Sequence, residues 1–338
     1  MKLLNCPGCL KPYQEGYCNA CRKLLFDGKK VPPILPFTRP DFNRVKNNPS
    51  SRISISGAQI KHSLKLTGKT LELTDVGGEY ILKPIPNDTF ENLAEIPINE
   101  HVTMQAARQV FGMNVAANAL VYFPDGDPAY LTRRFDRGQD GTKFQQEDFA
   151  QLSSRSEESH GEAYKYSGSY EEIAELMKRF VGPYAIEVER FFAHLLFNCL
   201  ILNGDAHLKN FSLYKNPADG IYRLTPAYDI LNTRFHLPNE ASDTALDLFK
   251  DDFETESYKA NAFYAKDDFF LFGERIGMKP VRINKLLDKF VNGFAGLESL
   301  IQRSAFKESS KSLYLDSVRD RSKRLKITHK TTAMPPTR

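Results

Sequence analysis

Residues 52–135 alternate apolar and polar positions in the way that is typical of β-strands. The pair Gly77 and Gly78 between two alternating runs is a hairpin turn signal. Val102, Ala106 and Val110 instead recur at helical spacing, and Asn99 is placed to cap this helix. The pattern therefore predicts a helix over 100–112 and strands at RISIS 52–56, HSLKL 62–66, TLELTD 70–75, EYILKP 79–84, NALVYF 118–123 and PAYLTRRF 128–135.

From about residue 145 the period changes from that of strands to that of helices. Apolar residues recur three and four positions apart in several long segments. Helices are predicted over EEIAELMKRFV 171–181, EVERFFAHLLFNCLIL 187–202, DDFFLFGERIG 267–277 and VRINKLLDKFVNGFAGLESLI 281–301. A strand-rich lobe followed by a helix-rich lobe indicates an α+β protein.

Proline marks the first boundary between these parts. VPPILPFTRPD, residues 31–41, is typical of an extended connector, which puts the boundary near residue 36. We expect an N-terminal unit at 1–36, a strand-rich lobe at 37–140, a helical lobe at 141–328 and a tail at 329–338. The tail, HKTTAMPPTR, lacks periodicity and is expected to be disordered.

Composition and charge narrow the class of protein. The chain has 338 residues, 41% hydrophobic and 26% charged, which suits a globular protein of about two folding units. No apolar run approaches the roughly 18 residues of a membrane helix, and no signal-peptide core precedes Cys6, so we expect a cytoplasmic protein. The net charge is +4, but residues 1–46 and 319–338 each carry an excess of six positive charges, which leaves −8 for the centre. An acidic centre argues against direct nucleic-acid binding and suits a metal-dependent site.

Four of the five cysteines form two CxxC pairs, CPGC with Cys6 and Cys9, and CNAC with Cys18 and Cys21. Two such turns supply four thiolates for a tetrahedral zinc ion, and Gly8 and Gly16 offer the backbone freedom that the turns need. The alternative is two reactive or disulfide-forming pairs. A four-cysteine site leaves no open coordination position, so the zinc would be structural. The remaining cysteine, Cys199, lies in an apolar run and is interpreted as a buried hydrophobe.

A carboxylate and an amide follow the second predicted long helix in the loop NGDAHLKNFSL, where Asp205 and Asn210 lie five positions apart. In phosphoryl transfer a carboxylate accepts the proton of the attacking hydroxyl, and a nearby amide oxygen holds a magnesium ion. Protein kinases supply both groups from one loop at this spacing. Asp229 in TPAYDIL follows a short strand, where a second metal ligand is expected.

Residues upstream of this loop are candidates for binding phosphate. Lys83 ends the strand YILKP, and Glu100 at the start of the next helix is a candidate ion-pair partner. ISISGAQIK, residues 53–61, is a hairpin whose backbone amides are able to cover phosphates. Each feature alone also fits a structural loop carboxylate, a solvated lysine or an ordinary turn. Their order along the chain, however, is that of a two-lobed kinase.

At these residues the chain resembles the HipA-like serine/threonine kinases of bacterial toxin-antitoxin systems. The resemblance spans about residues 50–300 and is most specific in NGDAHLKN with PAYDIL downstream. It extends to the phosphate-loop segment ISISGAQIKHSLKL, the lysine strand YILKP, the helix start INEH, the hinge LTRRFDR and the second-lobe start QQEDFAQL. It implies a two-lobed, protein-kinase-like fold behind the N-terminal zinc knuckle, with ATP and Mg²⁺ at the site.

The resemblance also implies a role for each matching residue. Asp205 would be the general base, Asn210 and Asp229 the magnesium ligands, and Lys83 the contact to the α- and β-phosphates. Ser54 and Ser56 match loop serines that are autophosphorylated, as in the short HipT-like members. The other ATP-binding residues would be Ser56, Gly57, Arg133, Phe135, Asp136 and His207, with the backbone near Arg133 and Phe135 at the adenine and Asp136 at the ribose.

The resemblance implies a toxin that phosphorylates itself and a translation-related protein, commonly an aminoacyl-tRNA synthetase. A small antitoxin protein and a DNA-binding antitoxin would be its partners. Full-length members carry a further N-terminal subdomain ahead of the phosphate loop, whereas residues 1–52 here hold the cysteine pairs. This favours the short form, in which a separate small protein supplies the missing piece. Arg133 replaces an acidic hinge residue, but the contact there would use the main chain.

Two other functions stay open. A small-molecule phosphotransferase also pairs a catalytic Asp with an Asn five residues later. A catalytically inactive adaptor would use the cysteine unit to bind a partner, although intact Lys83, Asp205, Asn210 and Asp229 argue against it. The polar stretch at 153–169 is interpreted as an activation-type or substrate-contacting loop, with a disordered linker as the alternative.

Overall fold

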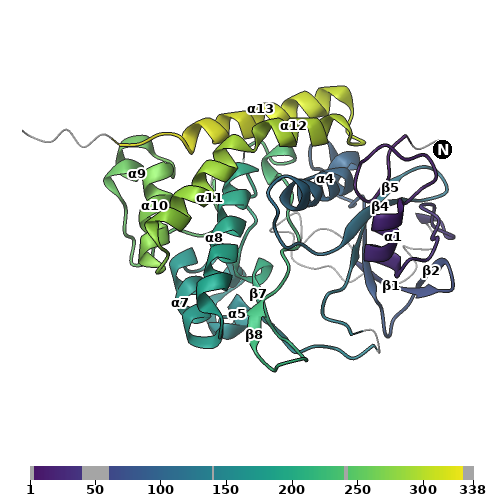
Figure 1. Ribbon diagram of the computed structural model, residues 1–338, viewed down its shortest axis with the longest axis horizontal. Helices are drawn as coiled ribbons and strands as arrows, with labels where there is room; N and C mark the ends of the chain where they lie inside the picture. The colour runs from purple at the N-terminus through teal and green to yellow at the C-terminus, as the bar shows by residue number, and fades with distance from the viewer. Residues whose placement is uncertain (1–3, 40–60, 139–140, 240–242, 330–338) are drawn as a thin grey trace, which may run out of the picture.

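The computed structural model describes residues 4–39, 61–138, 141–239 and 243–329. Within them, a strand-rich part and a helix-rich part lie next to each other, with α4 between them (Figure 1). The predicted order of a strand-rich lobe followed by a helix-rich lobe is confirmed. The predicted strand at 52–56 and almost all of the predicted tail lie outside the described residues, and the domain boundaries stay a prediction.

Five strands form one antiparallel sheet in the order β2-β1-β3-β5-β4. Apolar side chains of these strands are buried on both faces of the sheet, because other parts of the chain cover each face. In this register Lys83 on β3 stands opposite Tyr130 on β5. The strands are β1 (His62–Thr67), β2 (Thr70–Leu73), β3 (Tyr80–Pro84), β4 (Asn118–Tyr122) and β5 (Pro128–Arg133).

The N-terminal unit covers one face of this sheet. Its helix α1 (Asn19–Phe26) buries Leu25 and Phe26 in the same hydrophobic cluster as Leu82 and Leu131. The Tyr80 hydroxyl donates to Leu25 O at 2.7 Å, which ties α1 to β3. The proline-rich connector continues along β4, where Leu35 N–H donates to Tyr122 O at 2.8 Å. The cysteine unit is therefore built into the core of the strand-rich lobe.

Helix α4 (Ile96–Gln109), preceded by η1 (Leu93–Glu95), covers the other face and separates the sheet from the helical lobe (Figure 1). Every residue from Ile96 to Ala107 is buried. The predicted start of this helix, with Asn99 as its cap, is wrong. Pro97 lies in the first turn, where a backbone N–H would have no helical partner in any case, and the helix begins at Ile96, four residues earlier than predicted.

The helical lobe is arranged around the long buried helix α8 (Tyr184–Leu200). A small sheet in the order β6-β7-β8 lies beside it, formed by β6 (Gln146–Asp148), β7 (Ser212–Lys215) and β8 (Tyr222–Leu224). The remaining elements are α5 (Phe149–Leu152), α6 (Glu157–His160), η2 (Tyr164–Tyr166), α7 (Tyr170–Phe180), η3 (Leu208–Asn210), η4 (Thr233–Phe235), α9 (Glu256–Asn261), α10 (Lys266–Arg275), α11 (Pro280–Asn292), α12 (Phe294–Gln302) and α13 (Glu308–Arg324).

The last long helices of the chain differ from the prediction in two ways. The predicted helix at 281–301 is divided into α11 and α12 at Gly293, where a Cβ atom would lie 2.3 Å from the ring of Phe111. Phe111 itself stacks on Phe290 at a centroid distance of 4.7 Å and so joins the end of α4 to the helical lobe. Helix α13 was not predicted, because polar and charged residues dominate its sequence.

Across the residues that the structure describes, no helix combines the length and the apolar character needed to cross a bilayer.

Candidate active site

Lys83 joins the two lobes through two carboxylates. Its ammonium nitrogen lies 2.5 Å from Glu100 Oε1 on α4 and 2.5 Å from Asp229 Oδ1 on the segment after β8. The lysine is only 4% exposed and Glu100 only 1%. The predicted pairing of Lys83 with Glu100 is confirmed, and the same lysine also binds Asp229.

Lys83, Glu100 and Asp229 form a buried triad, in which burial and the neighbouring charges shift the pKa values of the lysine and of Glu100. Burial alone would lower the pKa of Lys83, but the carboxylates of Asp229 and Glu100 outweigh it and raise the pKa above its ordinary value. Burial raises the pKa of Glu100 to about 7, against the opposing effect of the Lys83 ammonium. Two carboxylates share one buried ammonium, so the triad carries an excess of negative charge when both are ionised.

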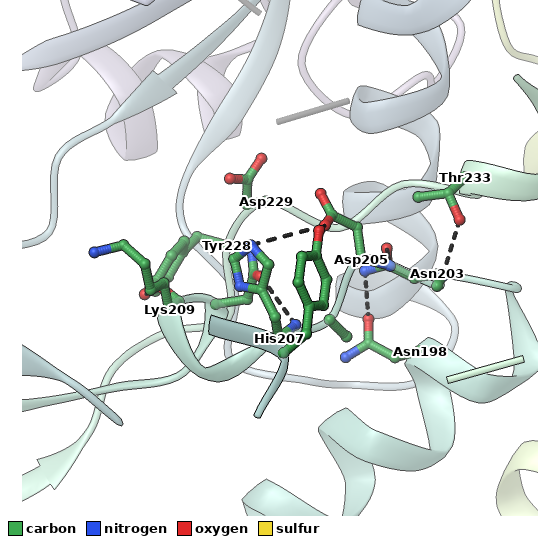
Figure 2. A network of polar contacts seen from close by, with 12 residues as sticks. Asn198, Asn203, Asp205, His207, Lys209, Tyr228, Asp229 and Thr233 are labelled. Carbon is green, nitrogen blue, oxygen red and sulfur yellow. Dashed lines mark hydrogen bonds and ion pairs between the residues drawn. The ribbon is translucent and has the colours of Figure 1, made fainter. Parts of the chain in front are cut away.

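The loop between α8 and β7 carries Asp205 and Asn210, and hydrogen bonds fix its course. Asn203 Nδ2 donates to Asn198 Oδ1 on α8 at 2.9 Å. Gly204 N–H donates to Thr233 Oγ1 at 2.9 Å, and the Thr233 hydroxyl donates to Leu202 O at 3.0 Å. Figure 2 shows Asn198, Asn203 and Thr233 on one side of Asp205, with His207 and Lys209 on the other.

Asn210 lies at the other end of this loop. It is 4% exposed, and its amide oxygen accepts the backbone N–H of His207 at 3.2 Å. This bond turns the amide oxygen of Asn210 toward the interior of the loop rather than toward solvent. The five-residue spacing therefore places a buried carboxylate, Asp205, and a buried amide, Asn210, on one short loop.

The segment after Asp229 is tied to α4 by Asn99. Asn232 N–H donates to Asn99 Oδ1 at 3.0 Å, and Asn99 Nδ2 donates to Asn232 O at 2.9 Å. Asn99 Nδ2 also lies 2.9 Å from His236 Nε2, and His236 Nδ1 lies 2.8 Å from Glu91 O. Because a carbonyl oxygen only accepts, Nδ1 carries the proton and Nε2 accepts from Asn99. Burial lowers the pKa of His236 to about 4.

Asp205 is surrounded by residues from two segments. The Tyr166 hydroxyl, on η2, donates to Asp205 Oδ1 at 2.6 Å. The Tyr166 ring meets the His207 ring edge-on at a centroid distance of 5.1 Å. Burial lowers the pKa of His207 to about 3, so this ring is neutral at physiological pH. The charge of Lys165 acts on both Asp205 and Asp229.

The predicted nucleotide residues of the hinge lie together at the end of β5. Arg133 forms a two-point ion pair with Asp27 of the N-terminal unit, at 2.8 Å for each contact. Asp136 forms a two-point ion pair with Arg134, at 2.9 and 2.6 Å. Phe135 packs against Tyr228, the neighbour of Asp229, at a ring distance of 5.6 Å.

The phosphate-loop residues Ser54, Ser56 and Gly57 lie outside the described residues.

The four cysteines converge in the N-terminal unit. Their sulfur atoms all lie within 4.8 Å of one another, and Cys9 Sγ is 3.7 Å from Cys18 Sγ. Tetrahedral Zn–S bonds of about 2.3 Å imply sulfur separations of roughly 3.8 Å, so the arrangement fits a zinc ion. All four are free cysteines, without a disulfide. Hydrogen bonds from Cys21 and Cys9 lower the pKa of Cys6 well below its ordinary value.

Gly8 is needed here for space rather than for backbone freedom. A Cβ atom at Gly8 would lie 2.7 Å from Cys21 Sγ. Gly16, in contrast, has a φ of +80° and meets the expectation of backbone freedom. The same turn contacts α4, where His101 Nε2 lies 3.1 Å from Gly8 O and Gln109 Nε2 donates to Cys9 O at 2.9 Å.

The donors at the site also fit a hard cation. Asp205, Asn210 and Asp229 offer carboxylate and amide oxygens, the ligands that Mg²⁺ prefers. Asp229 is already bound by cationic groups, with Lys83 on Oδ1 and Lys61 3.4 Å from Oδ2. A divalent cation at this carboxylate would offset the excess negative charge of the triad.

Sequence reasoning missed several residues of the site. Tyr166 falls in the polar stretch at 153–169, which was interpreted as an activation-type or substrate-contacting loop or as a disordered linker. The structure places Tyr166, on η2, against Asp205. Asn99 was assigned only a capping role and Thr233 none, because their contacts join segments that are distant in the sequence.

Comparisons with known proteins identify the family. Residues 53–296 match the family model described as HipA-like C-terminal domain. A Haemophilus influenzae protein named "Putative kinase" is 30% identical over 317 residues, which cover 87% of this chain and 90% of that protein. The Shewanella oneidensis "Serine/threonine-protein kinase toxin HipA" is 29% identical over 198 residues, which cover 54% of this chain and 43% of the toxin.

The fold agrees with these matches. The Shewanella oneidensis toxin-antitoxin complex of HipA, HipB and operator DNA contains a chain that superimposes with a TM-score of 0.63 at 22% identity, covering 86% of this chain and 73% of that one. The fold is therefore kinase-like. The chain belongs to the HipA-like C-terminal domain family.

The first testable prediction concerns His236. Its imidazole is protonated below about pH 6.5 in the unfolded chain but stays neutral in the folded protein down to about pH 4. The unfolded state therefore binds more protons in this window, and the free energy of unfolding falls by about 3 kcal/mol as the pH is lowered from 6.5 to 4. Urea denaturation between pH 7 and 4 should show that His236→Gln flattens this dependence.

The exposed His160 provides the control, since His160→Gln should leave the slope unchanged. An unaltered slope in His236→Gln would contradict the buried neutral assignment.

Proposed function

We propose that the protein is an ATP- and Mg²⁺-dependent serine/threonine protein kinase. The observation that carries this proposal is the buried triad in which Lys83 contacts Glu100 and Asp229. In phosphoryl transfer by protein kinases, the lysine and the helix glutamate form an ion pair, and the downstream aspartate binds metal. With Glu100 as a lasting partner, the Lys83 ammonium would be able to exchange its contact with Asp229 for phosphate oxygens.

Each residue of the site then has a role. The Lys83 ammonium binds the α- and β-phosphates and keeps Glu100 as its partner. The Asp205 carboxylate accepts the proton of the acceptor hydroxyl as that oxygen attacks the γ-phosphorus and the bond to the β-phosphate oxygen breaks. Asn210 and Asp229 would hold Mg²⁺, which neutralises developing phosphate charge. Catalysis then comes mostly from positioning and electrostatics.

Serine/threonine specificity and a toxin role rest on the relatives. The Shewanella protein is named a serine/threonine kinase toxin, and its solved complex holds HipB and operator DNA. We propose a toxin that phosphorylates a translation-related protein, such as an aminoacyl-tRNA synthetase. We also propose a small antitoxin protein and a DNA-binding antitoxin as its partners. Growth arrest on expression, with phosphate on one such protein in the lysate, would support this role. Normal growth without any new phosphoprotein would contradict it.

Autophosphorylation on Ser54 and Ser56 is a further part of this proposal, supported by the resemblance alone. Phosphopeptide mapping should find phosphate on one of these serines in wild type but not in Asp205→Asn. Phosphate transfer to other proteins without any phosphate at Ser54 or Ser56 would remove this part only.

The cysteine cluster supports a structural zinc site. Four converging sulfurs, a glycine that leaves room for one of them and the N–H of Cys18 donating to Cys6 Sγ at 3.2 Å all suit a closed tetrahedral ion. A closed site of four thiolates has no open position for substrate, so the ion would stabilise the N-terminal unit.

The second prediction tests the kinase assignment. Asp205→Asn removes the proton acceptor while keeping the shape of the side chain, so phosphate transfer from radiolabelled ATP into lysate proteins should fall by about 10²- to 10⁴-fold. Asp288→Asn, on the exposed face of α11, is the matched control and should retain wild-type transfer. Near-normal transfer by Asp205→Asn would contradict the assignment. Label that appears only in small molecules would favour a small-molecule phosphotransferase, and no label with wild type would favour an inactive adaptor.

The third prediction tests the zinc site. Protein purified without chelator should contain about one zinc ion per chain by elemental analysis. Gly8→Ala should lower this ratio, because its Cβ would displace the Cys21 sulfur. Cys199→Ala, which removes the cysteine outside the cluster, should leave the ratio unchanged. A wild-type ratio near zero would show that the cluster does not hold zinc.

A further inference from the structure

The Tyr166 hydroxyl donates a hydrogen bond to the side chain of Asp205, at 2.6 Å from Oδ1. A hydrogen bond of this length from a hydroxyl to a carboxylate is of the strong, charge-assisted kind. We propose that Tyr166 is a positioning residue of the phosphoryl-transfer site, which fixes the carboxylate of Asp205 for the acceptor hydroxyl. The proposal rests on the proposed kinase function, in which Asp205 is the general base.

A second tyrosine supports the contact between Tyr166 and Asp205. Tyr166 and Tyr170 lie four residues apart, and their hydroxyls donate to two consecutive residues of the catalytic loop. Tyr166 binds Asp205 Oδ1, and Tyr170 binds Ala206 O at 2.9 Å. Tyr170 is 1% exposed and begins helix α7, so this second contact anchors the segment to the core of the helical lobe.

Local packing holds the Tyr166 ring in one orientation. This ring meets the ring of His207 edge-on, at a centroid distance of 5.1 Å. Backbone bonds of the 3₁₀ turn, Tyr166 N–H to Ala163 O at 2.8 Å and Ser167 N–H to Tyr164 O at 3.2 Å, set the direction of the side chain. Lys165 lies over the same ring, 5.1 Å from its centroid.

A carboxylate that acts as the general base must hold one oxygen in a fixed direction toward the substrate hydroxyl that receives the phosphate. The bond from Tyr166 holds Oδ1, and the two oxygens of a carboxylate are rigidly linked, so the direction of Oδ2 is set as well. Fixed alignment of reacting groups contributes strongly to rate, and small misplacements are costly. The contribution of Tyr166 should therefore appear in the chemical step and not in the binding of ATP.

The experiment compares Tyr166→Phe with Tyr222→Phe, a matched change on β8 of the same lobe. ADP formation with casein and Mg²⁺ gives kcat and KM for ATP, and thermal unfolding verifies the fold. In Tyr166→Phe, which keeps the ring against His207, kcat should fall roughly 10- to 100-fold, the range of a lost hydrogen bond to a charged group, while KM for ATP stays within about twofold. Tyr222→Phe should match wild type in both constants.

Three results would overturn the role of Tyr166 while leaving the kinase function intact. The first is an unchanged kcat in Tyr166→Phe. The second is a higher kcat/KM for casein in the variant, since Tyr166 would then be blocking the acceptor position. The third is phosphotyrosine at Tyr166, which would make it an acceptor. Absence of ADP formation by wild type, with casein or with lysate proteins, would instead overturn the proposed function and with it this role.

Discussion

A lysine that is almost fully buried must be paired, and this constraint organises the rest of the molecule. Lys83 ends the third strand, and its ammonium reaches one carboxylate on α4 and another on the segment after β8. Leaving any of these charges unpaired inside the protein would be strongly destabilising. Lys83 therefore joins the sheet, α4 and the Asp229 segment through one buried ammonium.

Three consecutive residues of helix α4 contact three different parts of the molecule. Successive residues of an α-helix point about 100° apart, so Asn99, Glu100 and His101 leave the helix on different sides. Asn99 binds the Asn232 backbone in the helical lobe, Glu100 binds Lys83, and His101 approaches the carbonyl of Gly8 in the cysteine turn. The cysteine unit and the candidate active site thus pack against one turn of the same helix.

The parts of this structure that depend on local sequence pattern could be predicted from the sequence. Alternation predicted the strands around Lys83, and the spacing of Asp205 and Asn210 together with Asp229 downstream located the loops of the site. Features that arise from contacts between distant segments could not be predicted from the sequence. The close approach of Phe111 to Gly293, where the last predicted long helix divides, joins residues far apart in the sequence. The bond from Tyr166 to Asp205 likewise joins segments far apart in the sequence, so no local period indicates it.

The central claim is that Lys83 and Asp229 exchange their mutual contact for phosphate and metal when nucleotide binds. A crystal structure with Mg²⁺ and a non-hydrolysable ATP analogue tests this most directly. We expect the Lys83 ammonium to bind phosphate oxygens while it keeps Glu100, and we expect the metal to bind Asn210 and Asp229. A complex with the nucleotide bound elsewhere, or with Lys83 still on Asp229 and no metal at that carboxylate, would contradict the claim.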